Sequence, residues 1–134
     1  MTKFIITLLT VAAVTAGAET FRDASGKISG TATSSGGRTV YRDASGKITG
    51  TATVSGGRTI YRDASGKIVG SSSASGGRTV FRDSSGKITG TASSHGTGKI
   101  FRDASGRRIG STSKSGAATT VRDASGKKAG TVTK

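Results

Sequence analysis

The stretch Phe21-Arg22-Asp23-Ala24-Ser25-Gly26-Lys27-Ile28 decides the fold, because the chain repeats it five more times at intervals of 20 residues. The copies are Tyr41–Ile48, Tyr61–Ile68 and Phe81–Ile88, followed by looser versions that begin at Phe101 and at Val121. Nothing is inserted or deleted between the copies. A fixed period of this kind indicates one supersecondary unit that is copied along the chain.

Each unit predicts two strands and two turns. Arg38–Arg42 is β-branched and aromatic, and Lys47–Thr53 alternates with a period of two, as strands do. Asp43–Gly46 fits a type I turn, in which the Asp side chain accepts from nearby backbone N–H groups and the Gly adopts a positive φ in a G1 bulge. Gly56 and Gly57 supply a second turn where positive φ costs little.

The turns also predict a strand register. The first turn places Tyr41 opposite Ile48, and a second loop of four residues places Gly50 opposite Tyr61. Both registers assign the same faces, which agrees with the period of two along each strand. One face then carries Tyr41, Ile48, Gly50, Ala52 and Tyr61. The other face carries Arg38, Val40, Arg42, Lys47, Thr49, Thr51 and Thr53.

We therefore expect an all-β fold in which the repeats form an antiparallel β-hairpin meander. The alternative is a β-solenoid, in which each unit is one coil and identical residues stack about 4.8 Å apart. A third possibility is a chain that remains disordered until it assembles, since low hydrophobicity with high charge is typical of disorder. Strands of six or seven residues are shorter than the roughly 9–11 residues that outer-membrane barrels use.

The first 18 residues differ from the rest. Lys3 precedes an apolar run from Phe4 to Val14, and Ala16 and Ala18 are small residues at the −3 and −1 positions of a cleavage site. This pattern predicts a secretory signal peptide over residues 1–18, with cleavage before Glu19 and a secreted or periplasmic product. No later apolar segment predicts a transmembrane span. The predicted mature region, 19–134, holds six tandem units: 21–40, 41–60, 61–80, 81–100, 101–120 and the truncated 121–134.

The composition disfavours an enzyme. The chain has no Cys, its one His is His95, and its acids are Glu19 and one Asp in each repeat. The turn preference of Asp explains the repeat carboxylates without any catalytic role. Isolated carboxylates beside Arg and Lys do not make a calcium loop, which needs several at alternating positions. We expect no catalytic residue, cofactor, metal or small-molecule substrate. The residues assigned to turns are Asp23, Gly26, Asp43, Gly46, Asp63, Gly66, Asp83, Gly86, Asp103 and Gly106.

Charge is the main indication of function, since the net charge is +14. Basic residues recur at fixed repeat positions, so they should form rows that attract anionic polymers such as lipopolysaccharide, acidic polysaccharide or nucleic acid. The same residues could instead serve only to keep sheet edges from aggregating. The candidates for polyanion binding are Arg22, Lys27, Arg38, Arg42, Lys47, Arg58, Arg62, Lys67, Arg78, Arg82 and Lys87.

Two resemblances add expectations. Gly57–Ile68 resembles the YD repeats of RHS-type proteins, which implies β-hairpins that build surface structures without catalytic residues. The exported strand–turn–strand units resemble curli-type fibre subunits more faintly, which implies self-assembly. The Thr-x-Thr pairs, such as Thr51 and Thr53, resemble the arrays of insect-type antifreeze proteins and give ice binding as a remote alternative.

Two functions are thus expected. The first is a structural or surface-associated cell-envelope protein that assembles with itself through its strand edges. The second is a basic binding module for an anionic envelope or matrix polymer.

Overall fold

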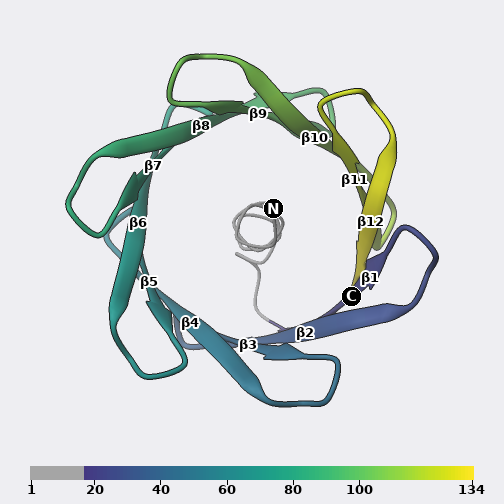
Figure 1. The fold of residues 1–134 in the computed structure, drawn as a ribbon, viewed down its shortest axis with the longest axis horizontal. Coiled ribbons are helices and arrows are strands. Elements are labelled where there is room, and N and C mark those ends of the chain that lie inside the picture. Colours follow the sequence, from purple (N-terminus) through teal and green to yellow (C-terminus); the bar gives the residue numbers. More distant parts are fainter. Residues whose placement is uncertain (1–16) are drawn as a thin grey trace.

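The computed structural model describes residues 17–134, which form twelve β-strands (Figure 1). The strands are β1 (Gly17–Asp23), β2 (Ile28–Ser35), β3 (Arg38–Asp43), β4 (Ile48–Ser55), β5 (Arg58–Asp63), β6 (Ile68–Ser75), β7 (Arg78–Asp83), β8 (Ile88–His95), β9 (Gly98–Asp103), β10 (Arg108–Ser115), β11 (Ala118–Asp123) and β12 (Lys128–Thr133). The predicted signal peptide falls almost wholly outside the described residues. Only its last two positions, Gly17 and Ala18, are described, at the start of β1.

The strands follow one another around a closed barrel, and β12 pairs with β1 to complete it. Figure 1 shows the strands arranged in a ring, with the C-terminal strand beside the first one. Neighbouring strands are antiparallel throughout. The predicted all-β antiparallel meander is therefore confirmed and closes into a barrel, whereas the alternative β-solenoid is wrong. A solenoid would place neighbouring strands in parallel, and an open meander would leave β1 and β12 as free edges.

The turn after each odd-numbered strand is built on the repeat Asp. In the second unit the Gly46 N–H donates to the Asp43 carbonyl at 3.0 Å, and the Asp43 N–H donates to the Lys47 carbonyl at 2.9 Å. Gly46 has a φ of 90°, which glycine adopts without the clash that a Cβ brings. In an up-and-down meander these six turns all lie at one end of the barrel, here called the Asp-turn end. The other connections lie at the Gly-turn end.

The connections at the Gly-turn end are shorter than the sequence predicts. Gly56 and Gly57 alone join β4 to β5, so Ser55 pairs with Arg58 and Ala52 with Tyr61. Both glycines have positive φ, 57° and 77°, as a two-residue type I′ turn requires. The four-residue loop and the pairing of Gly50 with Tyr61 are therefore wrong. The register moved by two residues, which left the assignment of these strands to faces unchanged.

A bulge at Thr49 changes the other register. Arg42 pairs with Ile48, but Tyr41 pairs with Gly50, so Thr49 is the extra residue on β4. Because of this extra residue, Ile48 lies on the same face as Arg42 and is 41% exposed. The predicted pairing of Tyr41 with Ile48 is wrong because the Asp43 N–H bonds to the Lys47 carbonyl across the turn, which sets Arg42 opposite Ile48. The predicted place of Ile48 on the same face as Gly50 is wrong because the bulge at Thr49 reverses the faces between them.

Large and small side chains alternate across the inner face. Tyr41 pairs with Ala32 on β2 and with Gly50 on β4, and Phe81 pairs with Ser72 and Gly90. This alternation lets rings and small residues share the interior of a barrel. The buried cluster consists of Phe21, Ala32, Tyr41, Ala52, Phe81, Ala92, Phe101, Val121 and Val132.

Candidate polyanion-binding surface

The arginine that follows each aromatic position points outward at the Asp-turn end. The Arg42 guanidinium donates to the Gly46 carbonyl at 3.1 Å, and equivalent bonds of 2.9 to 3.2 Å hold the others. Each bond uses one of the five N–H groups of a guanidinium and fixes its position. Of the predicted candidates, Arg22, Arg42, Arg62 and Arg82 lie here, either exposed or half-buried.

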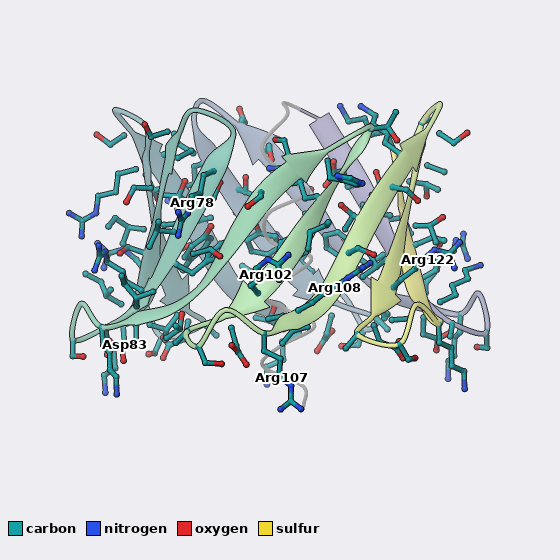
Figure 2. All side chains as sticks on the ribbon, turned by 90° about the horizontal axis from the view of Figure 1, so that it is seen from above. Arg78, Asp83, Arg102, Arg107, Arg108 and Arg122 are labelled. Carbon is teal, nitrogen blue, oxygen red and sulfur yellow. The ribbon has the colours of Figure 1, made fainter. Side chains whose placement is uncertain are left out.

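A second set of cations lies in the same turns. Lys27, Lys47, Lys67 and Lys87 directly follow the glycine of each turn and are exposed. Together with the arginines they surround the Asp-turn end. The remaining candidates, Arg38, Arg58 and Arg78, begin β3, β5 and β7 at the Gly-turn end and are exposed there. Figure 2 shows Arg78 well away from the turn that carries Asp83. The eleven candidates thus form two bands on the outer surface, one at each end.

The carboxylate of each repeat Asp accepts hydrogen bonds from donors within its own turn. Asp43 Oδ1 accepts from the Ser45 hydroxyl at 2.6 Å and from the backbone N–H groups of Ser45 and Lys47 at 2.9 and 3.0 Å. These bonds, that of the Ser45 hydroxyl first, hold the pKa of Asp43 below its ordinary value. The pKa values of Asp23, Asp63, Asp83, Asp103 and Asp123 are lowered in the same way. The predicted turn residues therefore lie in turns, each Asp at the first position and each Gly at the fourth.

Basic residues in the last two units join this surface, although the candidate list stopped at Lys87. The structure places Arg108 opposite Arg102 and Lys128 opposite Arg122, at the positions that hold Ile in the earlier units. Figure 2 shows Arg102, Arg108 and Arg122 on one side of the barrel. The signal was present in the sequence as the replacement of Ile by Arg and Lys, but an outward Ile could not be inferred without the bulge.

Inside the barrel at the Gly-turn end lies a cavity of about 360 Å³. Glu19, Lys99 and Lys114 are among its lining residues. Glu19 is 6% exposed, and its Oε2 has no hydrogen-bond partner among the described residues. Burial raises the pKa of Glu19, while the charges of Lys134 and Lys114 act in the opposite direction.

The residues considered for catalysis stay apart. His95 is exposed at the end of β8, and the repeat Asp side chains lie in separate turns. Among residues 17–134, no three His, Cys, Asp or Glu side chains are grouped so that they could hold a metal ion. The part of the chain that the structure describes also contains no helix of the length and hydropathy that crossing a bilayer demands.

The Thr-x-Thr pairs lie on the outer wall. Thr51 pairs with Val40 on one side and with Arg62 on the other, and Thr53 pairs with Arg38 and Ile60. The wall curves around a closed barrel, and the threonines alternate there with cations. The ice-binding alternative stays an expectation.

Comparison of the chain with protein-family models, with curated proteins and with solved structures finds no match. The resemblances to YD repeats and to curli-type subunits therefore stay expectations.

Proposed function

We propose that this protein is an exported, non-enzymatic, surface-associated barrel that binds anionic polymers of an envelope or matrix through its basic outer surface. One observation carries the proposal. The repeated cations face outward at fixed positions, while the repeat carboxylates are held inside their own turns by hydroxyl and backbone donors. The outer surface therefore presents rows of positive charge, and rows of this kind attract polyanions.

The closed sheet favours binding over strand-edge assembly. Self-assembly through edges needs unpaired backbone groups on an outer strand. Here β1 pairs with β12 through Thr20–Thr133, Phe21–Val132, Arg22–Thr131 and Asp23–Gly130. Assembly by this route would first have to break these pairs, so we propose a monomeric binding protein in place of a fibre subunit.

Acidic polysaccharide is the polymer class that we favour. Proteins that bind single-stranded nucleic acid usually stack its bases on aromatic side chains. Here the aromatic positions of the repeats face the interior, where Phe81 and Phe101 are 6% and 4% exposed. The outer wall instead offers guanidinium, ammonium and hydroxyl donors, which suit carboxylate and sulfate groups.

Retention on immobilised heparin, a sulfated polysaccharide, tests this proposal. We expect the purified protein to bind at about 50 mM NaCl and to elute below about 0.5 M, because ionic contacts weaken steeply with salt. Neutral agarose of the same bead size is the control. Passage through the heparin column without retention at the low salt concentration would overturn the proposed function. Sedimentation at rising protein concentration tests whether the protein is a monomer. Growth of filaments would favour assembly through strand edges over the monomeric binding protein.

A further inference from the structure

At the Asp-turn end, the outer wall is not equally charged around its circumference. In the first four hairpins the outward arginine faces an isoleucine on the next strand, as Arg42 faces Ile48. Ile28, Ile48, Ile68 and Ile88 are each 41–42% exposed, so this side presents four apolar side chains. In the last two hairpins the isoleucine is replaced, and Arg102 faces Arg108 while Arg122 faces Lys128.

The strands β9 to β12 therefore carry the densest positive charge at the Asp-turn end of the outer wall. At the Asp-turn end these two hairpins hold six cations against two carboxylates, whereas units two and three hold four cations against two there and have Arg38 and Arg58 at the other end. The six are Arg102, Arg107, Arg108, Arg122, Lys127 and Lys128, and all of them are exposed. We call this set the β9–β12 patch. Figure 2 shows four of its arginines on the side of the barrel that faces the viewer.

The pairing within the patch is unfavourable for the free protein. Residues directly opposite one another in an antiparallel pair have Cβ atoms about 4.5–5.5 Å apart, and like charges at such positions repel. Arg102 and Arg108 occupy one such pair, and Arg122 and Lys128 occupy another. The carboxylates nearest in sequence, Asp103 and Asp123, are held in turns by their serine and backbone donors. An anionic group placed between the paired cations would remove this repulsion.

We propose that the β9–β12 patch is the docking site for a linear acidic polysaccharide, which lies across the two cation pairs on one side of the barrel. This inference rests on the proposed function and adds the site and the orientation of the ligand. The pairs lie on successive hairpins, two strands of about 4.8 Å apiece apart, so a chain with regularly spaced carboxylates can reach both. Ile48 and Ile68, in the hairpins on the opposite side of the ring, then face away from the ligand.

The test uses alginate, a linear polyuronate, and the double variant Arg108→Ile with Lys128→Ile. This variant gives the last two hairpins the residue of the first four, so the fold is retained. We expect the affinity at about 50 mM NaCl to fall about tenfold and the salt slope of the binding constant to fall by about 2, one for each lost cation. We also expect the Tm of the free variant to rise by a few degrees, because the like-charge pairs are gone.

Two control variants separate the patch from net charge. Lys47→Ser with Lys67→Ser removes the same charge from units two and three, and it should weaken binding by less than about threefold. Adding Ile48→Arg and Ile68→Lys to the first double variant restores the net charge on another side of the barrel. Chemical acetylation of the lysines, with and without alginate, then shows which lysines the ligand covers. Alginate should protect Lys127 in the unsubstituted protein and Lys47 and Lys67 in the relocated variant.

The outcomes distinguish the two proposals. A protein that does not bind alginate or heparin at low salt overturns the proposed function itself. Binding that is weakened equally by the two charge-removing variants, with no preferred protection of Lys127, overturns the patch and leaves the proposed function in place. Tighter binding of a single-stranded oligonucleotide than of alginate of equal charge overturns the choice of polysaccharide.

Discussion

Gly50 lies so close to the backbone of Arg62 on the next strand that a Cβ on this glycine would be 2.6 Å from the Arg62 carbonyl oxygen. Gly30, Gly70 and Gly90 stand in the same relation to the strand that follows them, at 2.5 to 2.6 Å. These glycines lie on the inner face beside the aromatic residues, as in the pair of Gly50 with Tyr41. The absence of a side chain therefore sets how closely neighbouring hairpins approach.

Substitution Gly50→Ala should destabilise the barrel by about 2–4 kcal/mol, because the clash is with backbone and neither strand can move without disturbing its pairs. In an unconstrained strand the same change would be favourable, so the sign of the effect reports the close approach. Urea unfolding measures it. Thr51→Ala, the adjacent outward position, should cost less than about 1 kcal/mol. Equal effects of the two variants would contradict the packing described for Gly50.

The repeat carboxylates predict acid sensitivity. Their folded-state pKa values lie below the ordinary value of 3.8, so they stabilise the fold above that pH. This contribution is lost as the pH falls through the lowered values. Glu19 acts in the opposite direction, because burial raises its pKa. Asp43→Asn should lower the Tm by a few degrees at pH 7, and this difference should shrink progressively as the pH falls below 3.8. Thermal unfolding over a series of pH values checks this, and a Tm difference that does not shrink in acid would contradict it.

The two kinds of isoleucine should differ in their response to mutation. Ile48 is outward and 41% exposed, whereas Ile109, one position later in its own repeat, packs against the buried cluster. Ile48→Thr should change the free energy of unfolding by less than about 0.5 kcal/mol, and Ile109→Thr should cost about 1 kcal/mol. Both substitutions keep a β-branched residue, so strand propensity is matched. A larger loss of stability for Ile48→Thr than for Ile109→Thr would contradict the outward position of Ile48.

The closing pair of strands should control association. Val132 is 3% exposed and pairs with Phe21 across the contact between β1 and β12. Val132→Asp buries a charge there and should destabilise this contact by about 3 kcal/mol. Opened edges then pair between molecules, so sedimentation should detect oligomers. Thr133→Asp, at the adjacent outward position, should remain monomeric. A monomeric Val132→Asp protein of unchanged stability would contradict the closure.

Export can be checked by mass. Strand β1 begins at Gly17, and cleavage before Glu19 would leave its pairs from Glu19 to Arg22 with β2 intact. The mass of the exported protein should correspond to residues 19–134, and Ala18→Phe at the −1 position should leave an uncleaved precursor. A full-length mass in the exported fraction of the unsubstituted protein would contradict the predicted signal peptide.

The sequence predicted the elements of this fold better than their assembly. The positions of the strands followed from the alternation in Lys47–Thr53, and the turn chemistry of Asp43 and Gly46 determined the hairpin. The outward position of Ile48 could not be predicted, because one extra residue at Thr49 reverses the face and no local pattern marks a bulge. Closure could not be predicted either, since it depends on the twist summed over all hairpins and not on any one residue.

The candidate site was likewise predicted only in part from the sequence. Recurrence alone placed Arg42 and Lys47 on a basic surface, but it did not identify the paired cations of the last two units, which are looser copies of the repeat. Arg108 could be recognised as part of a cation pair only once the register placed it opposite Arg102.

The contact between β1 and β12 also allows the width of the barrel to change with the number of repeats that the gene encodes. Each 20-residue unit contributes one hairpin, and the first and last hairpins meet with the antiparallel geometry used elsewhere in the ring. In-frame duplication of one unit would add two strands and widen the circumference by about 10 Å without a new kind of joint. The number of 20-residue units in the gene therefore determines the diameter of the barrel.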